Sequence, residues 1–316
     1  MQSHIIQYLK FAPGFVSGED ISRELHMSRT AVWKHIEELR ASGYEIEAVP
    51  HHGYRLVGIP DRLSSLEVQY RLGTKKFGGY LYHFNTIDST MNEAFRLGTE
   101  GAAEGTVVVA ETQTKGRGRM GRTWSSPKAR GIYFSIILRP SCAPSAVSGL
   151  TLLAAVAVSE AMEKVSGLKA LIKWPNDLLL EGKKVCGILT ELRAETDRVS
   201  FVCLGVGINV NNTFSQLLPE ATSLRIEKKE MVSRVELLQE ILRSLERRYR
   251  AALKSGFSSV LNDWKARSAT LNRKVRFTER GVSFEGTAFD VDSDGALLVR
   301  LEGGKVMKRV SGDILL

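Results

Sequence analysis

Three arginines alternate with glycines between residues 116 and 124, where the sequence reads Gly-Arg-Gly-Arg-Met-Gly-Arg-Thr-Trp. Each guanidinium presents a planar set of donors that matches carboxylate and phosphate oxygens. The glycines permit backbone conformations in which the chain approaches a ligand closely. Arg117, Arg119 and Arg122 therefore predict a loop that closes over an anionic ligand. The alternative, a basic loop that stays solvated, fits this interleaving of arginine and glycine less well.

The same segment has the spacing G-x-G-x-x-G between Gly116 and Gly121. That spacing indicates dinucleotide binding when a strand precedes it and a helix begins directly after it. Residues 106–110 read as a buried strand, but the glycines lead through loop sequence into a second strand at 132–138. No helix N-terminus is predicted to hold a pyrophosphate. A phosphate loop of the Walker type is excluded too, because no Gly-Lys-Ser/Thr follows.

A second group of polar residues lies between positions 173 and 187, in Lys-Trp-Pro-Asn-Asp and Lys-Val-Cys-Gly. Pro175 is expected to interrupt a strand and to leave Asn176 and Asp177 at a bend, where an amide and a carboxylate can reach a ligand or a metal ion. An Asn-Asp pair by itself usually forms only a turn. Here Lys173 and Lys184 are predicted at opposite ends of a short hairpin, so basic and acidic groups converge as a metal–nucleotide site requires.

Composition restricts the class of protein. The chain has 316 residues, 43% of them hydrophobic and 25% charged, which is ordinary for two or three globular domains. A formal net charge of +9 favours an anionic partner. Cys142, Cys186 and Cys203 are too scattered for a disulfide framework and are expected to be small buried residues. No signal peptide or membrane span is expected, so the sequence predicts a cytoplasmic protein without a membrane partner.

Residues 1–60 predict a separate winged helix-turn-helix. Ser17 and Ser28 are placed to cap helices at 17–25 and 29–41, and a hairpin after Gly43 supplies the wing. Buried positions are expected at Val32, Ile36 and Leu39. The residues left available to DNA are Arg29, Thr30, Trp33, Lys34 and Arg40. A protein-interaction module is the alternative, because Glu37 and Glu38 dilute the basic face.

The rest of the chain predicts two further regions. Residues 65–268 alternate strand and helix patterns and indicate a mixed sheet of the α+β class. A helix at 233–254 carries a basic cluster that is expected to be a solvated face: Arg243, Arg247, Arg248 and Arg250. Residues 270–316 predict only short strands, separated by turns at 279–281, 292–295 and 302–304. A small SH3-like barrel is the expected architecture of this last region.

These motifs together resemble the biotin protein ligases, and the N-terminal module makes the match to the bifunctional class, which is also the biotin operon repressor. The resemblance covers essentially the whole chain through Asp-Ser-Thr at 88–90, Gly-Arg-Gly-Arg-x-Gly-Arg, Lys-Trp-Pro-Asn-Asp, Lys-x-x-Gly-Ile-Leu and Gly-x-Gly-Ile-Asn. It implies a class II synthetase-like catalytic domain that activates biotin with ATP to biotinyl-5′-adenylate. The biotin then passes to a lysine of the biotin carboxyl carrier protein of acetyl-CoA carboxylase. The resemblance also implies Mg²⁺, operator DNA and a ligand-promoted homodimer.

The resemblance assigns roles by position. Ser89, Thr90 and Gln113 are expected to hydrogen-bond the ureido ring of biotin, although Asp or Ser before a helix is more often a cap. Lys184 is expected to hold the biotin carboxylate, Arg119 and Arg122 the phosphates, and Asp177 the metal ion. Lys184, Arg119 and Lys173 are the candidate catalytic residues. The further ligand-binding residues are Gly116, Arg117, Gly118, Trp124, Asn176, Gly187 and Asn209.

The chain departs from the family pattern at two positions. The family often has Asn directly after Asp-Ser-Thr, where this chain has Met91 and then Asn92, and Met120 replaces a frequent Arg. The change at position 91 affects any ligand contact made by that side chain. The change at position 120 affects how tightly the loop holds the adenylate. Two alternatives to a biotin ligase remain: a transcription factor that senses a nucleotide-like ligand without turnover, and an enzyme of the same fold that acts on lipoate.

Overall fold

The computed structural model describes residues 1–195, 198–279 and 281–315. The chain divides into two compact units, Met1–Arg62 and Leu63–Leu316. The second unit contains both the central sheet and the C-terminal strands, so the regions predicted at 65–268 and 270–316 pack as one body. The exact boundaries of the three predicted domains stay predictions.

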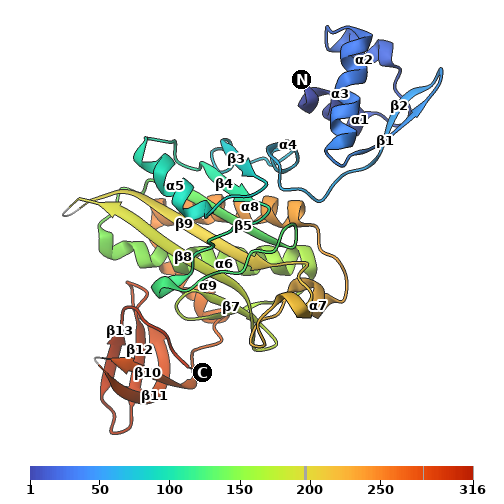
Figure 1. Ribbon diagram of the computed structural model, residues 1–316. Coiled ribbons are helices and arrows are strands. Elements are labelled where there is room, and N and C mark those ends of the chain that lie inside the picture. Colours follow the sequence, from blue (N-terminus) through green and yellow to red (C-terminus); the bar gives the residue numbers. More distant parts are fainter. Residues whose placement is uncertain (196–197, 280, 316) are drawn as a thin grey trace. The chain divides into compact units, whose positions relative to one another are not determined.

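The first unit is a helix-turn-helix followed by a two-stranded wing (Figure 1). Its elements are α1 (Gln2–Phe11), α2 (Gly18–Glu24), α3 (Arg29–Ala41), β1 (Glu45–Val49) and β2 (Gly53–Gly58). Both predicted caps are confirmed, because Ser17 accepts a hydrogen bond from the backbone N–H of Asp20 and Ser28 accepts one from Ala31. The predicted apolar face of α3 is also confirmed, with Val32, Ile36 and Leu39 buried.

The second unit is built on a seven-stranded mixed sheet with the strand order β3-β4-β5-β9-β8-β7-β6. β3 runs parallel to β4, and the other neighbouring pairs of this sheet are antiparallel. The strands are β3 (Leu81–Phe84), β4 (Val107–Ala110), β5 (Gly131–Leu138), β6 (Leu171–Lys173), β7 (Asp177–Leu180), β8 (Lys183–Ala194) and β9 (Val199–Asn209). This topology confirms the predicted α+β class.

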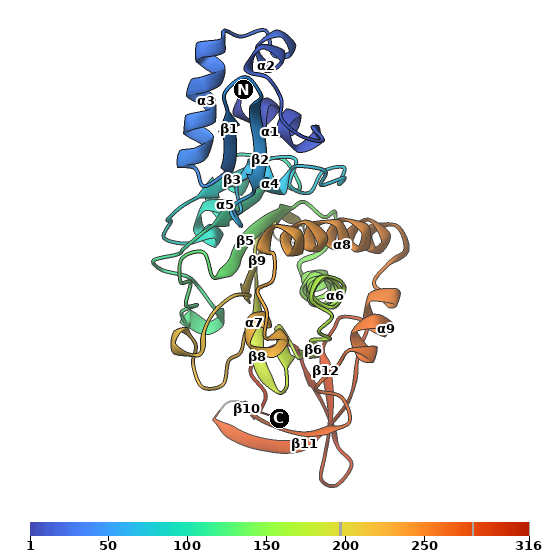
Figure 2. The ribbon, with the colours of Figure 1, turned by 90° about the vertical axis from the view of Figure 1, so that its right-hand side faces the viewer.

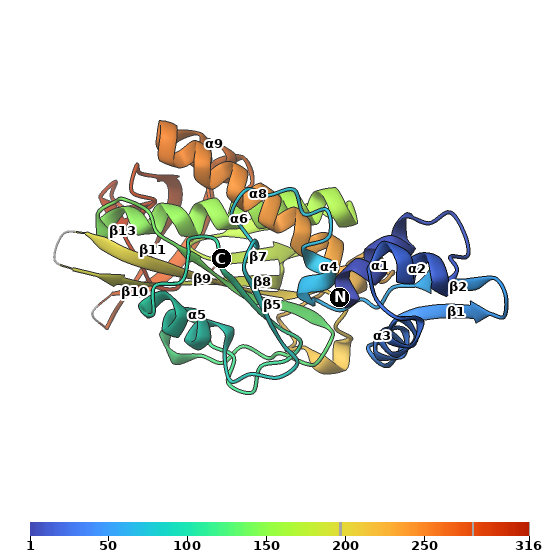
Figure 3. The ribbon, with the colours of Figure 1, turned by 90° about the horizontal axis from the view of Figure 1, so that it is seen from above.

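Helices cover the two faces of the sheet unequally (Figure 3). α6 (Val147–Ser166), with α8 (Arg234–Ser255) and α9 (Ser258–Ala266) packed against it, covers one face, and α5 (Thr90–Thr99) lies on the other. Figure 2 looks along α6, with α8 running across it. Shorter helical segments are α4 (Ser65–Val68), α7 (Leu224–Lys228), η1 (Arg119–Gly121), η2 (Pro144–Ala146) and η3 (Phe214–Gln216).

Residues along β9 alternate between these two faces, as the strand geometry requires. The even positions from Val202 to Ile208 belong to the core beneath α6 and α8. Phe201 and Cys203 point to the opposite face, which we call the α5 face, and pack with α5. The next two positions on the α5 face are Gly205 and Gly207. The α5 face therefore lacks β9 side chains at this end, and side chains from other segments, Met91 and Trp124, pack close to the strand there.

The C-terminal strands form a separate antiparallel sheet in the order β10-β11-β12-β13. They are β10 (Arg273–Glu279), β11 (Val282–Val291), β12 (Leu297–Leu301) and β13 (Val306–Arg309). The predicted turns at 292–295 and 302–304 are confirmed, whereas the turn at 279–281 includes residue 280, which lies outside the described residues. Trp174 joins this sheet to the central one, because its indole N–H donates to the Gly295 carbonyl at 3.1 Å.

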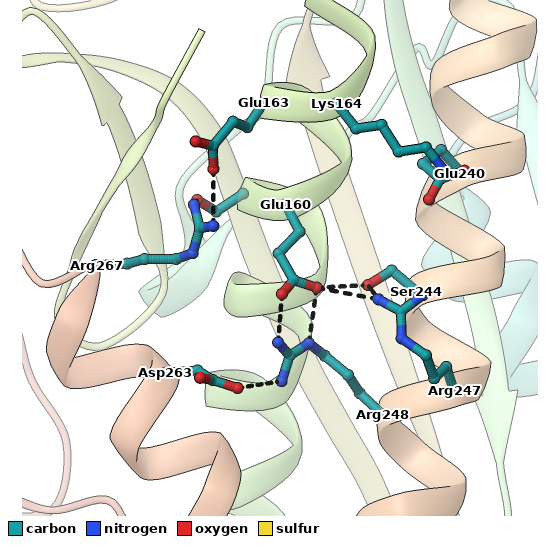
Figure 4. Close-up of polar contacts among 10 residues, drawn as sticks. Glu160, Glu163, Lys164, Glu240, Ser244, Arg247, Arg248, Asp263 and Arg267 are labelled. Carbon is teal, nitrogen blue, oxygen red and sulfur yellow. Dashed lines mark hydrogen bonds and ion pairs between the residues drawn. The ribbon is translucent and has the colours of Figure 1, made fainter. Parts of the chain in front are cut away.

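The arginines of α8 do not form the solvated face that we predicted for them. Arg248 Nε donates to Glu160 of α6 at 2.9 Å, and its NH1 donates to Asp263 of α9 at 2.8 Å (Figure 4). Arg247 donates to the same Glu160 carboxylate, and Arg243 donates to a backbone carbonyl. The prediction holds only in that Arg247 and Arg250 are exposed. The carboxylate partners lie on two other helices, Glu160 on α6 and Asp263 on α9, so the basic run alone could not reveal them.

Glu111, the residue after β4, is a buried carboxylate at the base of the arginine-glycine loop. Its oxygens accept from the backbone N–H of Leu63 at 2.8 Å and from Arg234 at 2.7 Å, and His83 Nε2 lies 3.4 Å away. Burial raises the pKa of Glu111, but His83 and Arg234 stabilise the charged form more strongly and lower the pKa to about 2. A lowered folded-state pKa adds stability above the unfolded pKa of 4.5, and that stability is lost as the pH falls toward 2.

Replacing Glu111 with Gln is expected to lower the free energy of unfolding at neutral pH by about 3–5 kcal/mol, because the buried Arg234 charge loses this carboxylate. The wild-type protein should also lose stability as the pH falls below about 4.5, and the variant should lose part of that dependence. Urea unfolding followed by tryptophan fluorescence across the acid range measures both effects. A variant as stable as the wild type at neutral pH would contradict this role for Glu111.

The described part of the chain contains no helix with both the length and the apolar character of a membrane span. Cys186 and Cys203 are buried, as predicted for small core residues, whereas Cys142 is only partly buried.

Candidate active site and nucleic-acid interface

Two glycines lie opposite each other on neighbouring strands of the α5 face. Gly187 of β8 pairs with Gly207 of β9. A Cβ atom on Gly207 would lie 2.5 Å from Trp124 Cε2, and one on Gly187 would lie 2.9 Å from Trp124 Cζ3. The indole of Trp124 therefore packs directly on the backbone of both strands, where any larger residue would displace it. Trp124 also closes the loop on itself, because its backbone N–H donates to the Gly116 carbonyl at 2.9 Å.

Replacing Gly207 with Ala is expected to lower the free energy of unfolding by about 1–3 kcal/mol and to move the Trp124 indole into solvent, because the new methyl group overlaps the ring. Urea unfolding and the wavelength of tryptophan emission are the measurements. Gly14→Ala is the matched control, since a Cβ atom added there would have no neighbouring atom within 4 Å. An unchanged emission spectrum for the Gly207 variant would show that the ring does not need this gap.

A β-bulge aims Lys184 at the same face. Cys186 pairs with Leu178 of β7, but Lys184 pairs with Leu179, so β8 has one extra residue at this point. Lys184 Nζ lies 2.8 Å from Asp177 Oδ1, without the angles of a hydrogen bond, and 5.5 Å from the centre of the Trp124 ring. The side chain remains 32% exposed. Its ammonium group can therefore meet an incoming anion beside Trp124.

Arg119 joins the loop to the predicted Asn-Asp bend. Its NH1 donates to Asn176 Oδ1 at 2.7 Å, and Asn176 Nδ2 donates to the Ile188 carbonyl at 2.8 Å. Burial lowers the pKa of Arg119, the nearby Asp177 carboxylate opposes this shift, and Arg122 adds to it. The guanidinium stays charged at neutral pH. A charge that is partly removed from water interacts more strongly with an anion than a solvated one.

The other two arginines of the loop also have partners in the chain. Arg117 donates to Asn92 Oδ1 at 2.9 Å and to the Glu191 carboxylate. Arg122 donates to Asp313, which follows the C-terminal strands. An anion that binds to Arg122 must therefore compete with Asp313. The loop is held at both flanks by side chains of the protein.

A second polar cluster lies at the N-terminus of α5. Gln113 Oε1 accepts from the backbone N–H of Thr90 at 2.8 Å and from its hydroxyl at 3.1 Å, and Gln113 Nε2 donates to Ser126 at 2.9 Å. The Thr90 hydroxyl also lies 3.0 Å from Ser135 Oγ. Ser89 is buried and caps α5 by accepting from the Met91 N–H at 3.2 Å, which is the alternative role for this residue, and its contact with the ureido ring stays a prediction. Amide and hydroxyl groups are thus gathered on the α5 face, as recognition of a polar ring requires.

A cavity of about 130 Å³ opens beside Arg119 and Asn176. Its walls include Ser148, Thr151, Trp174, Thr190 and Ser311. The cavity therefore reaches from the Asn-Asp bend to the C-terminal residues, next to the most buried guanidinium of the loop.

Two further predicted site residues lie at the ends of strands. Lys173 ends β6 and pairs with Asp177 in the strand register. Asn209 is buried, and its amide group donates to the Thr222 carbonyl at 3.1 Å. Asn209 thus holds the segment after β9, and a direct ligand contact by this residue stays a prediction.

The predicted DNA-contacting residues share the outer face of α3. Arg29, Thr30, Trp33 and Lys34 are all exposed, and the Trp33 side chain projects from the helix with 57% of its surface accessible. Arg40 is different, because its Nε donates to the Ile46 carbonyl of β1 at 3.0 Å. The prediction that Arg40 is available to DNA is therefore wrong, and this residue ties α3 to the wing.

Comparison with known proteins accounts for both units. Family models match in chain order: an HTH domain at residues 2–55, the biotin/lipoate A/B protein ligase family at 83–209, and the biotin protein ligase C terminal domain at 270–316. The bifunctional ligase/repressor BirA of Bacillus subtilis is 44% identical over 304 residues, which are 95% of this chain and 93% of that protein. The chain belongs to the bifunctional biotin ligase/repressor family.

Two further comparisons support this assignment. The bifunctional ligase/repressor BirA of Escherichia coli is 32% identical over 92% of this chain and 89% of its own length. The solved biotin protein ligase of Aquifex aeolicus, in complex with biotin and ATP, is 29% identical, with a TM-score of 0.64. That match covers 75% of this chain and 98% of the Aquifex chain. The family resemblance found in the sequence is therefore confirmed.

The first departure from the family pattern has a structural explanation. Met91 is buried and packs with the apolar core between α5 and the sheet, so its side chain belongs to that core. Asn92, one residue later, donates to Asp88 at 2.7 Å and accepts from Arg117. The second departure, Met120, is 74% exposed on the loop.

Sequence reasoning missed four residues that contact the predicted site residues. Glu191 lies four residues after Gly187 on β8, so strand alternation could have placed it on the same face. Ser126 follows Trp124 closely in the sequence and Ser135 lies within β5, but nothing in the sequence distinguishes either from other serines. Asp313 follows the C-terminal strands, 191 positions after Arg122, and no sequence signal links the two residues.

Proposed function

We propose that this protein activates biotin with ATP to biotinyl-5′-adenylate and transfers the biotin to a lysine of a biotin carboxyl carrier domain. The observation that carries the proposal is the position of Lys184 and Trp124 on the α5 face, beside the polar cluster around Gln113, with Arg119 and Asn176 paired at the adjoining Asn-Asp bend. One anion can be held by Lys184 and another by Arg119. Such positioning holds two negatively charged substrates close together, whereas in water they would repel each other.

The geometry supports the following course for the first reaction. Lys184 holds the biotin carboxylate beside Trp124, and one carboxylate oxygen attacks the α-phosphorus of ATP. The bond from that phosphorus to the oxygen leading to the β-phosphate breaks, and diphosphate leaves. Arg119 neutralises charge that grows on the phosphate oxygens, from a position fixed in advance by Asn176.

The second reaction needs no covalent enzyme intermediate, because the adenylate is already an activated acyl donor. The amine of the carrier lysine attacks the biotin carbonyl carbon, AMP leaves with the electrons of the broken bond, and the new amide nitrogen loses a proton. Lys184 stays close to the carbonyl oxygen during this transfer.

Magnesium is the expected metal ion, and the residues fit a site of the kind it uses with nucleotides. Mg²⁺ is usually held by one or two carboxylates together with substrate phosphates and water. Asp177 supplies one carboxylate at the bend, and the residues described contain no group of three or more His, Cys, Asp or Glu side chains that could hold a metal by themselves. Bound there with ATP, the ion would neutralise phosphate charge.

Incubation with ATP, Mg²⁺, labelled biotin and a carrier domain tests the ligase proposal. Transfer of label to the carrier supports it. A protein that binds nucleotide and biotin but leaves the carrier unlabelled would be a ligand-sensing transcription factor. Preferential transfer of lipoate would identify the lipoate-type enzyme instead.

The exposed face of α3 supports a second proposed function, repression through operator DNA. Replacing both Arg29 and Lys34 with Ala is expected to weaken operator binding by about 10- to 100-fold and to reduce its dependence on salt, because two phosphate or base contacts are lost. Fluorescence anisotropy at several salt concentrations measures both, with a duplex of unrelated sequence as the control. Unchanged operator affinity would favour a protein-interaction module.

We also propose that the adenylate promotes a homodimer that places two winged helices on a palindromic operator, and that the protein works in the cytoplasm. A ligand can shift the dimer equilibrium only if it binds the dimer more tightly than the monomer. Sedimentation with and without biotin and ATP is the test. Equal self-association constants in both conditions would defeat this coupling.

A further inference from the structure

A continuous line of polar contacts connects the first turn of α5 to β8 through the loop. Asn92 Nδ2 donates to Asp88 Oδ2 at 2.7 Å, and Asn92 Oδ1 accepts from Arg117 NH1 at 2.9 Å. The same NH1 lies 3.1 Å from Glu191 Oε2, and NH2 donates to Glu191 Oε1. The guanidinium and the carboxylate thus form a two-point pair, which fixes orientation as well as distance.

The position of this line matters more than its strength. Glu191 pairs with Cys203 in the register of β8 and β9, so it lies on the α5 face with Gly187, four residues earlier. Asn92 belongs to α5, which packs on β5 and β9, and β9 lies between β5 and β8 in the sheet. Arg117 therefore bridges the glycine-lined part of the α5 face. The loop that contains Arg117 crosses the face where the ligand is proposed to bind.

We propose that Glu191 and Asn92 are positioning residues that hold Arg117, and with it the loop, across the bound adenylate and so set how slowly the adenylate leaves. The proposal rests on the proposed ligase function and adds two residues that the family motifs do not include. It also separates the arginines by role. Arg117 is engaged by protein partners on two sides, whereas Arg119 and Arg122 adjoin the Asn-Asp bend and the C-terminal residues.

We call the contacts of Arg117 with Asn92 and Glu191 the latch. The chemistry of the adenylate gives a reason for it. An acyl adenylate reacts with water and with any accessible amine, so an enzyme that makes it gains specificity by keeping it covered until the carrier lysine arrives. The contacts of Arg117 are partly exposed, with 42% of the Arg117 side chain and 27% of the Glu191 side chain accessible. Exposed pairs are weak and are screened by salt, which suits a contact that must open in each cycle.

Glu191→Gln, Asn92→Ala and the double variant test the latch, with Glu195→Gln as the matched control. Glu195 is an exposed glutamate that follows β8, away from the loop contacts. Preformed labelled adenylate is chased with unlabelled biotin and ATP, and its release is followed over time. We expect each single variant to release adenylate about fivefold faster and the double variant about tenfold faster, since both changes free the same guanidinium.

Two further readouts separate positioning from general destabilisation. Added salt should speed release from the wild-type protein and have little effect on Glu191→Gln, because only the wild type has this ion pair to screen. Biotin labelling of lysines on an unrelated protein should rise with the release rate, while the rate of adenylate formation stays close to that of the wild type. A destabilised fold would instead slow adenylate formation.

The outcomes distinguish the latch from the ligase proposal. If the wild-type protein forms no adenylate, the proposed function fails and the latch fails with it. If the wild type forms adenylate and the Glu191 and Asn92 variants release it at the wild-type rate, the latch alone is overturned.

Discussion

Replacing Lys184 with Met is expected to slow adenylate formation by about 100- to 1000-fold, because one positioned donor at a developing charge is worth this much in rate. Nζ is the cation that adjoins both Asp177 and Trp124, at the point where a β-bulge turns β8 toward the α5 face. Methionine keeps most of the side-chain volume and removes the charge. Single-turnover formation of labelled adenylate at saturating ATP is the measurement.

Two controls test whether the slower reaction results from loss of the charge at position 184 itself. Lys183→Met removes the same charge from the neighbouring residue, which is exposed at the start of β8, and it should react like the wild type. Urea unfolding should give similar midpoints for all three proteins, because Lys184 is partly exposed and contributes little to the core. A Lys184 variant with wild-type rates would show that the biotin carboxylate is held elsewhere.

Replacing Arg119 with Met should have the second-largest effect, a loss of about 100-fold in the kcat/KM for ATP. The Arg119 side chain is only 21% exposed, and Asn176 holds it beside the cavity. The charge of Arg119 should therefore act on phosphate oxygens more strongly than that of Arg122, whose side chain is 62% exposed. The KM for biotin should change much less, since Lys184 and the Gln113 cluster remain.

A matched control for Arg119 is Lys128→Met, an exposed basic residue after the loop. Its kinetic constants should equal those of the wild type. If the Arg119 variant raised the KM for biotin and the KM for ATP equally, the division of the site into a biotin part and a phosphate part would be wrong.

Local sequence signals were sufficient for the elements that position the site. Caps at Ser17, Ser28 and Ser89 are short-range devices, because the hydroxyl bonds to backbone N–H groups two or three residues away. Alternation along β9 is readable from the sequence in the same way, although we drew no prediction from it, because strand geometry puts Gly205 and Gly207 on the face opposite Val206 and Ile208. The loop between two strands was also predictable, since no helix pattern follows the glycines.

Contacts between distant segments were not predictable in this way. The bulge that turns Lys184 depends on how β7 pairs with β8, and one residue of slippage reverses the direction of a side chain. Asp313 and Glu191, which pair with arginines of the loop, are distant from them in sequence. Arg248 was taken for a solvated residue because Glu160 and Asp263 lie on other helices. In each case a charged side chain pairs with a residue that only the folded chain brings close to it.

The most direct test of this account is a crystal structure of the protein grown with biotin and an ATP analogue that cannot react. We expect both ligands on the α5 face, with the biotin carboxylate next to Lys184 Nζ and Trp124 and with phosphate oxygens next to Arg119. Density for both ligands at another place, with the space beside Lys184 and Trp124 filled only by water, would contradict the account.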